Sequence, residues 1–340
     1  MVNVGILGLG PTWETRYRPA LQKLRSRIAI RAVYDLVANR AEQVAAEWNA
    51  TAMGGAVALS ERSDLAAFLM LGTGWHRWES LRLLCAKKKP VYIAGDLGTE
   101  LETLHRLHNS AFAAGQTLMP ELGLRYTPAT SRLRELLATR LGNAHRIVID
   151  AVTSGPADST AVSVAEAETQ FLIKLFDWCG YITQTLPVRL WARPLETPNE
   201  SARQFRSITI EFHPRNSGPV YPRVEVRLSR RPDRDVASLA QGQTAVGLGE
   251  LHQEIFCERG RAVIPAATEI SWSAGGELTS ESLSSERSEV EVMLDHFCRR
   301  VVGGLIPVAD LSDVSRCAAL VQAARQSLKS DCAVLVNGSV

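Results

Sequence analysis

The chain has 340 residues, of which 46% are hydrophobic and 22% charged, and its formal net charge at pH 7 is +2. This length suits two domains better than one. The composition is that of a globular protein, and so small a net charge gives no reason to expect a nucleic acid partner. The start of the chain shows no signal peptide, and no stretch approaches the roughly 20 apolar residues of a membrane span.

The six cysteines are scattered along the chain and include no Cys-x-x-Cys pair. Such a distribution is typical of buried, reduced thiols and not of disulfides or a zinc site. We therefore expect a cytoplasmic protein that has no structural metal and no membrane partner.

The stretch from Val2 to Asp35 carries the clearest motif. A short apolar run ends at Leu7 and breaks into Gly8-Leu9-Gly10, after which a helix is predicted. A strand that stops at a glycine turn before a helix leaves backbone N–H groups that bind a pyrophosphate. Asp35 ends the next apolar run, where a carboxylate can bind the ribose hydroxyls of a dinucleotide. The residues expected to bind the cofactor here are Gly8, Leu9, Gly10, Pro11, Thr12, Trp13 and Asp35.

The cofactor expected at this motif is NAD, because the carboxylate of Asp35 repels the 2′-phosphate of NADP. Arg40 lies a little downstream and can soften that preference, so NADP remains possible. The motif departs from the full fingerprint, since Trp13 stands where a third Gly or Ala lets helix and strand pack closely. The alternative interpretation is a glycine turn in an α/β core that binds nothing.

The elements predicted in the first 120 residues alternate between helix and strand. Helices are expected over residues 13–25, 38–48, 75–86 and 101–114, and further strands over residues 28–34, 65–71 and 90–93. This order predicts a doubly wound parallel sheet. The strand that ends at Leu71 is followed by Gly72-Thr73-Gly74, a second turn of small residues at the sheet edge where ligands bind. We add Gly72, Thr73 and Gly74 to the expected cofactor residues.

The pattern changes near residue 120. Helices are expected over residues 127–141 and 167–186, and strands over residues 147–152, 206–212, 224–228, 251–257, 262–264 and 270–272. Most of these strands alternate apolar and polar residues, which is typical of a sheet with one face on a core. We expect a Rossmann domain over residues 1–120 and, over residues 121–340, an α+β domain with a large, mostly antiparallel sheet, whose C-terminal helices can pack back on the first domain. The tail predicts one helix that ends at Gly303-Gly304 and a last helix capped by Ser312.

Several segments together resemble the Gfo/Idh/MocA family of NAD(P)-dependent oxidoreductases over essentially the whole chain. They are Val4-Gly-Ile-Leu-Gly-Leu-Gly10, Ala32-Val-Tyr-Asp35 before Ala38-Asn-Arg-Ala-Glu42, Arg125-Tyr126-Thr-Pro-Ala, Leu294-Asp-His-Phe297 and the segment from Ala309 to Ser327. The resemblance implies a Rossmann domain followed by a substrate domain with an open mixed sheet. It also implies hydride transfer to or from sugars, polyols or related small molecules, and a homo-oligomer that forms through the C-terminal sheet.

The residues that do the family's chemistry differ in this chain. The Lys of the family's Glu-Lys-Pro falls on Gly95, in the run Ile93-Ala94-Gly95-Asp96. The family's Asp-x-Gly-x-His helix reads Asp177-Trp178-Cys179-Gly180-Tyr181, so Tyr181 replaces the acid/base His. Because oxidation of a carbinol needs a group that moves the hydroxyl proton, the usual proton path is not encoded.

A replacement can be proposed on the same helix, where Lys174, Asp177 and Tyr181 lie at positions i, i+3 and i+7, on one strip. Tyr181 would be the acid/base if the charge of Lys174 favours its phenolate. Glu121 and Arg125, near the domain junction, would orient a polar substrate. The alternative is that the strip is only the polar edge of an amphipathic helix.

Three functions follow from this pattern. The first is an NAD(P)-dependent oxidoreductase with a rearranged acid/base set, acting on a sugar, polyol or related hydroxy or keto compound. The second is a catalytically silent homologue that binds a ligand or a partner. The third is redox-neutral hydrolysis or elimination through transient oxidation, which some members of the family perform.

Overall fold

The computed structural model of the chain describes residues 1–72, 76–95, 97, 100–154, 161–194, 206–214, 221–231 and 251–336. The chain divides into two compact units. Unit 1 comprises Met1–Leu122 and Val290–Ser315, and unit 2 comprises Gly123–Glu289 and Arg316–Val340. Within the described part of the chain, no helix combines the length and the apolar character needed to cross a lipid bilayer.

Unit 1 is built on a parallel sheet of six strands in the order β3-β2-β1-β4-β5-β6. The strands are β1 Val2–Leu7, β2 Ile28–Tyr34, β3 Thr51–Ala52, β4 Ala67–Met70, β5 Val91–Ile93 and β6 Leu118–Pro120. The order reverses between β1 and β4, so the carboxyl ends of these two strands flank the crevice where such sheets bind ligands. The predicted doubly wound sheet is confirmed.

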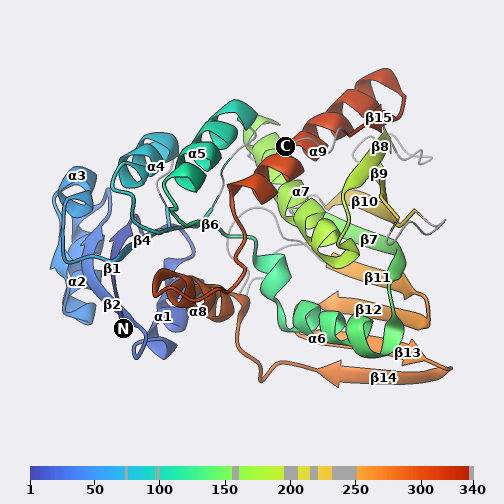
Figure 1. Cartoon of the computed structure of the whole chain (residues 1–340), viewed down its shortest axis with the longest axis horizontal. Helices are drawn as coiled ribbons and strands as arrows, with labels where there is room; N and C mark the ends of the chain where they lie inside the picture. Colours follow the sequence, from blue (N-terminus) through green and yellow to red (C-terminus); the bar gives the residue numbers. More distant parts are fainter. Residues whose placement is uncertain are drawn as a thin grey trace. The chain divides into compact units, whose positions relative to one another are not determined.

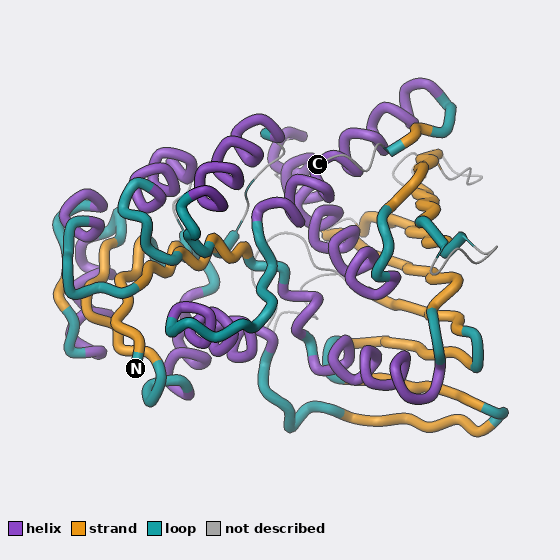
Figure 2. The backbone as a smooth tube through the Cα atoms, viewed as in Figure 1, coloured by secondary structure: helices purple, strands orange, loops and turns teal. Residues whose placement is uncertain are grey.

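The helices of unit 1 cover both faces of this sheet (Figures 1 and 2). They are α1 Arg18–Lys23, α2 Ala38–Trp48, α3 Ala56–Ser60, α4 Arg77–Cys85, α5 Leu101–Ala113 and α8 Glu289–Val301. Burial on both faces explains why the strands are predominantly apolar. The segment predicted as one helix over residues 13–25 is instead a π-helical turn, Trp13–Tyr17, followed by the short α1, which has Pro19 in its first turn.

Helix α8 comes late in the chain but packs in unit 1. Its buried face carries Val290, Met293, Leu294 and Phe297, spaced as an amphipathic helix requires. Two ion pairs hold its polar side, Lys23 with Glu291 at 2.7 Å and Arg27 with Asp295 at 2.5 Å. Helix α8 is therefore joined to the end of α1 and to the turn after it by ion pairs as well as by apolar contacts.

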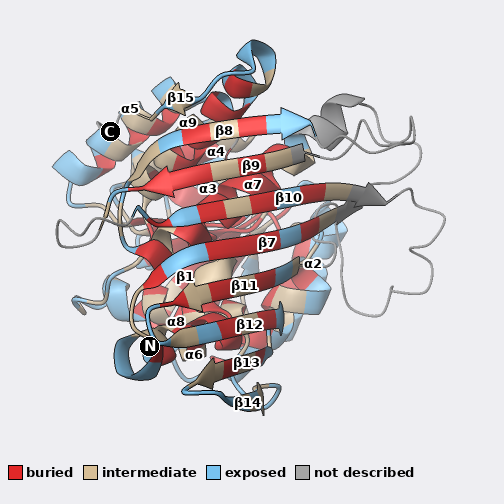
Figure 3. Ribbon diagram, turned by 90° about the vertical axis from the view of Figure 1, so that its right-hand side faces the viewer, coloured by how far each residue is buried: buried red, intermediate tan, exposed pale blue. Residues whose placement is uncertain are grey.

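Unit 2 is built on a sheet of nine strands in the order β14-β13-β12-β11-β7-β10-β9-β8-β15 (Figure 3). Strands β7 and β10 pair in parallel, and every other neighbouring pair is antiparallel, as predicted. The strands are β7 Ala144–Ser154, β8 Pro187–Pro194, β9 Arg206–Phe212, β10 Arg223–Arg231, β11 Leu251–Cys257, β12 Gly260–Ala266, β13 Glu269–Ala274, β14 Glu277–Ser282 and β15 Val334–Leu335.

Helices lie on one face of the large sheet, behind the strands in Figure 3. They are α6 Pro128–Leu136, which continues as the π-helical turn Leu137–Leu141, α7 Ala161–Thr183 and the part of α9 (Leu311–Ser330) that belongs to unit 2. The strand residues that face the helices are buried, among them Ile147, Ile149, Val224 and Val226. Alternate residues face away and include many charged side chains, which is the pattern of a sheet with one face on a core.

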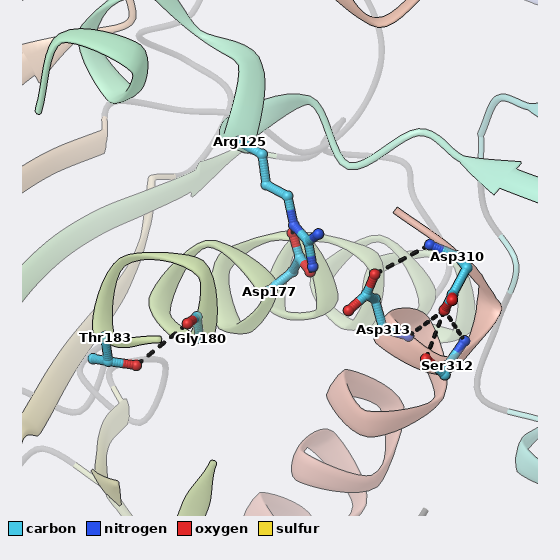
Figure 4. A network of polar contacts seen from close by, with 7 residues as sticks. All are labelled: Arg125, Asp177, Gly180, Thr183, Asp310, Ser312 and Asp313. Carbon is cyan, nitrogen blue, oxygen red and sulfur yellow. Dashed lines mark hydrogen bonds and ion pairs between the residues drawn. The ribbon is translucent and has the colours of Figure 1, made fainter. Parts of the chain in front are cut away.

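The cap predicted for the last helix is wrong by two residues. Helix α9 begins at Leu311, so Ser312 lies inside its first turn. The capping side chain is Asp310, whose Oδ1 accepts hydrogen bonds from the backbone N–H groups of Ser312 and Asp313 at 2.8 and 3.3 Å (Figure 4). A carboxylate suits this position because it also interacts favourably with the helix dipole.

Candidate functional site

The glycine turn after β1 and the turn after β4 pack directly against each other. Gly8 and Gly10 have φ angles of +71° and +69°, in the left-handed region that favours glycine. A Cβ at Gly8 would lie 1.5 Å from the carbonyl oxygen of Gly72, and a Cβ at Gly72 would lie 2.4 Å from the Cα of Gly10. Side chains at these positions are therefore excluded, and the backbone of both turns stays bare at the carboxyl edge of the sheet.

Asp35, at the end of β2, is hydrogen bonded to the glycine turn. Its Oδ2 accepts the backbone N–H of Leu9 and its Oδ1 that of Val37, both at 2.9 Å. Each carboxylate oxygen has a second lone pair, so the group can still accept a ribose hydroxyl. The guanidinium of Arg40 lies 3.8 Å from Asp35 and donates to the carbonyl oxygen of Gly10 at 3.2 Å.

The chain next to Asp35 exposes two apolar side chains, Leu36 and Val37, which are 64% and 53% exposed. Exposed aliphatic groups beside a bare glycine turn are suited to the flat face of an adenine ring. Sequence reasoning did not select them, because a single exposed aliphatic residue is ordinary on a protein surface. Their position beside Asp35 is what makes them informative.

The indole of Trp13 is buried, with an exposed fraction of 1%. Its Nε1 has no hydrogen bond partner among the residues that the structure describes. Pro11 is exposed and Thr12 half-buried, and the carbonyl of Thr12 accepts the N–H of Arg16 at 2.9 Å as the helical turn begins. The bulky residue in place of the third glycine is thus accommodated in the interior of unit 1. Thr73 and Gly74 lie outside the described residues.

A buried carboxylate lies at the carboxyl end of β6. Oε2 of Glu121 accepts the backbone N–H of Gly95, which follows β5, at 3.2 Å, and Oε1 pairs with Arg16 at 2.8 Å. Burial, followed by the negative charge of Glu121, raises the pKa of the neighbouring Tyr17 well above its usual value. Sequence reasoning selected Glu121 but missed Arg16, which is distant in sequence and sits in an unremarkable helical segment.

In unit 2, Arg125 and Asp177 form a two-pronged ion pair (Figure 4). Nε of Arg125 donates to Oδ2 of Asp177 at 2.7 Å, and Nη2 donates to Oδ1. The Asp177 side chain is 1% exposed, so its charge is compensated inside the protein. The predicted substrate residue and one predicted catalytic residue are therefore direct partners. This pairing suits Asp177 to positioning Arg125 and not to exchanging a proton.

Tyr181 is half-buried near the end of α7, with two guanidinium groups over its ring. The Cζ atoms of Arg125 and Arg134 lie 5.3 and 5.0 Å from the ring centroid. Both distances are within the range of a cation–π contact. Lys174, the cation that sequence reasoning placed next to Tyr181, is half-buried on the same helix. Arg134 was missed, because nothing in the sequence indicates that α6 brings it to Tyr181.

Several known proteins have a similar fold. No protein-family model matches the sequence, and no curated protein matches it at a significant level. Solved structures do match over nearly the full length. UDP-N-acetylglucosamine 3-dehydrogenase GnnA from Acidithiobacillus ferrooxidans is 17% identical with a TM-score of 0.74, covering 97% of this chain and 98% of its own. The chain has the Gfo/Idh/MocA fold.

Two further matches show how widely this fold is used. An NAD-binding oxidoreductase from Klebsiella pneumoniae is 14% identical with a TM-score of 0.78, covering 99% of both chains. The transcriptional regulator Gal80p from Kluyveromyces lactis is 16% identical with a TM-score of 0.77, covering 99% of this chain and 94% of its own. At these identities the likeness establishes the Gfo/Idh/MocA fold and leaves the activity open.

The structure gives a physical reason for the missing lysine of the Gfo/Idh/MocA pattern. Gly95 has a φ angle of +77°, where an L-residue such as lysine is strained. No described atom lies within 4 Å of the place where a Cβ would stand, so crowding is not the cause. The backbone conformation after β5 therefore favours glycine itself at this position.

Proposed function

We propose that this protein is an NAD(P)-dependent oxidoreductase that acts on a sugar, polyol or related small hydroxy or keto compound. The bare glycine turn whose Leu9 amide is bound by Asp35 is the observation that carries the proposal. The N–H of Gly8 donates to the carbonyl of Tyr34 at 2.7 Å and that of Leu9 to Asp35, so these two amides shape the turn. The N–H groups that follow, of Gly10, Thr12 and Trp13, would hold the diphosphate, and Asp35 would hold the adenine ribose. The bound dinucleotide would supply the hydride acceptor or donor. NAD is the expected form, because Asp35 repels a 2′-phosphate.

The proton-transfer role is assigned to Tyr181, with Lys174 on the same strip of α7. The guanidinium groups of Arg125 and Arg134 over the Tyr181 ring support this choice, because they place two fixed positive charges beside it. Asp177 would hold Arg125, and Arg125 and Glu121 would orient a polar substrate. Gly72, Thr73 and Gly74 complete the proposed cofactor turn.

Cofactor binding is tested first, by thermal unfolding with NAD⁺, NADH, NADP⁺ and NADPH at millimolar concentration. A ligand that binds only the folded state raises the melting temperature. We expect the largest rise with NAD(H). No rise with any of the four nucleotides would contradict both the oxidoreductase proposal and redox-neutral chemistry through transient oxidation.

Turnover is tested next, by nicotinamide absorbance over a panel of sugars and polyols. A substrate from this panel would then be used to compare Tyr181→Phe with the native protein. Loss of turnover with unchanged NADH affinity is expected. Unchanged turnover would remove Tyr181 from the mechanism and leave it as the polar edge of α7.

The second candidate function is a silent homologue that binds a ligand or a partner. It is favoured by the backbone of Gly95, which disfavours the lysine of the family pattern, and by the transcriptional regulator among the structures of the same fold. NADH binding without turnover on any member of the panel would support this candidate.

We also propose a homo-oligomer that forms through the outer face of the nine-stranded sheet. This face carries charge ladders such as Arg189–Glu211–Arg223, in which Glu211 is almost fully buried. Sedimentation equilibrium on the native chain tests the proposal, and a monomer at micromolar concentration would contradict it. The scattered cysteines remain the reason to propose a cytoplasmic location.

A further inference from the structure

A hollow of about 350 Å³ lies within unit 2, separate from every residue assigned above to cofactor or substrate. Its walls come from α6 and the turn after it, the start of β7, the end of α7 and the hairpin between β11 and β12. The volume is at the lower end of the range for small-molecule sites. Three stretches distant in sequence, residues 134–144, 182–184 and 258–259, thus form one polar hollow.

Two arginines line this hollow, Arg134 and Arg259. Neither guanidinium has an ion pair or a hydrogen bond acceptor among the residues that the structure describes. The Cζ atom of Arg134 lies 5.0 Å from the centroid of the Tyr181 ring, a contact that supplies no oxygen acceptor for its N–H groups. Two guanidinium groups that line one hollow without a carboxylate partner favour an anion that supplies the missing acceptors.

Glu258 is the one acidic residue in the lining, and it is already engaged by Asn143. Its Oε2 accepts the backbone N–H of Asn143 at 3.1 Å, and its Oε1 accepts the side-chain amide at 2.9 Å. The backbone N–H of Glu258 also donates to the carbonyl of Asn143 at 3.1 Å. The lining residues therefore carry a net charge of +1, and Glu258 serves to hold the hairpin in place.

The backbone around the hollow is closely constrained. Gly142 has a φ angle of +77°, and a Cβ there would lie 2.5 Å from Oε2 of Glu258. The backbone N–H of Arg259 donates to the carbonyl of Leu141 at 2.9 Å. Gln184 adopts a left-handed φ of +55° where α7 ends, and its backbone N–H donates to the carbonyl of Gly180 at 2.8 Å. The two arginines are thus carried on a preorganised frame.

From this geometry we propose that the hollow binds a small organic oxyanion, whose phosphate or carboxylate group is held between Arg134 and Arg259. The side-chain amide of Gln184 would add a polar contact, and the apolar side chains of Leu137 and Ile182 would contact the organic part. The proposal does not rest on the oxidoreductase assignment, because none of the lining residues is proposed to bind the cofactor or the substrate or to transfer the proton. Arg134 also contacts Tyr181, so its variants are judged by anion binding and not by turnover.

The experiment measures binding of inorganic phosphate and of citrate to the full chain by calorimetry and by thermal unfolding, with sodium chloride keeping the ionic strength constant. The variants are Arg134→Gln and Arg259→Gln. The matched control is Arg193→Gln, which also removes one arginine charge from unit 2 but lies outside the hollow and pairs with exposed Asp331.

We expect saturable binding of at least one anion to the native chain and to Arg193→Gln, and at least a tenfold weaker affinity in both hollow variants. Arg134→Lys, which keeps the charge and loses the guanidinium plane, should give an intermediate loss, and it serves if Arg134→Gln does not fold. NADH should raise the melting temperature of Arg259→Gln by as much as it raises that of the native chain. Absence of saturable binding, or equal affinities in all variants, would overturn the proposal.

A second readout locates the anion. Phenylglyoxal modifies accessible arginines, and peptide mass spectrometry reports each site. Citrate should protect Arg134 and Arg259 and leave Arg193 unprotected. Equal protection of all three, or protection of neither hollow arginine, would show that the anion acts elsewhere.

Discussion

The backbone N–H of Leu9 donates a hydrogen bond to Oδ2 of Asp35 over 2.9 Å, across 26 positions of sequence. One carboxylate therefore organises the glycine turn after β1 and the chain that leaves β2. The residue proposed to contact a ribose therefore also holds the glycine turn in shape. Loss of this group should affect the shape of the turn as well as the ribose contact.

The substitution Asp35→Asn tests this dual role. An amide has only one acceptor oxygen, so the N–H of either Leu9 or Val37 loses its acceptor, which costs about 1–3 kcal/mol for a buried group. We expect a lower melting temperature and at least a tenfold rise in the Kd for NADH, measured by nucleotide fluorescence. Asp64→Asn is the control, because Asp64 is an exposed partner of Arg62. Unchanged NADH affinity in Asp35→Asn would contradict the ribose assignment.

The contact between the two turns is tested by Gly72→Ala. The new Cβ would lie 2.4 Å from the Cα of Gly10, and backbone on both sides has little room to move. Overpacking of this kind costs about 1–3 kcal/mol. Urea unfolding should show the loss, and the rise in melting temperature with NADH should shrink. The matched control is Gly54→Ala, where no described atom lies within 4 Å of the new methyl group. Equal stability of the two variants would refute the close approach.

The loss of folding stability at acid pH depends in part on Glu281. Hydrogen bonds from Arg132 at 2.7 and 3.0 Å outweigh burial, and with a further bond from Trp272 they hold the pKa of the Glu281 carboxyl below its usual value. A carboxylate with a lowered folded pKa adds stability above its unfolded pKa, and this stability is lost as the pH falls through the folded pKa.

Replacing Glu281 with Gln should therefore lower the free energy of unfolding near neutral pH. The deficit should shrink as the pH falls below the ordinary glutamate pKa of about 4.3. Chemical unfolding of the native protein and the variant at a series of pH values measures this difference in the free energy of unfolding. Glu277→Gln is the comparison, since Glu277 is exposed on the same strand. A deficit that stays constant with pH would indicate lost packing and not lost charge.

Cys332 should react with thiol reagents faster than the other cysteines. Cys332 is exposed, whereas burial raises the pKa of Cys85, Cys257 and Cys298 to about 12 and that of Cys179 above its usual value. Because the thiolate is the reactive form, a disulfide reagent at mildly alkaline pH should modify one thiol rapidly. The others should react only after denaturation. Rapid modification of the Cys332→Ser variant would contradict the burial of the remaining thiols.

Sequence alone determined most of the local elements and their order, although the strands Pro187–Pro194 and Glu277–Ser282 were not predicted. Parallel strands buried on both faces require continuous apolar runs, and sheets with one face on a core require alternation, so Val2–Leu7 and Arg206–Phe212 were recognisable as different kinds of strand. The glycine turn and Asp35 were recognisable because the motif is defined by residue types at set positions within one short stretch of sequence. The cap at Asp310 was missed by two residues because several nearby side chains can cap a helix, and only the start of the helix decides among them.

Only the tertiary structure decided which side chains meet. Arg16 with Glu121, Arg125 with Asp177 and Arg134 with Tyr181 are partners from separate elements. Helical spacing placed Lys174 and Asp177 on one strip, but packing between elements brought the arginines to it. Side chains extend several ångströms from the backbone, and small differences in how two elements pack decide which pairs are in reach. Periodicity within one segment does not predict how that segment packs against another. The contacts between these side chains could therefore be identified only from the tertiary structure.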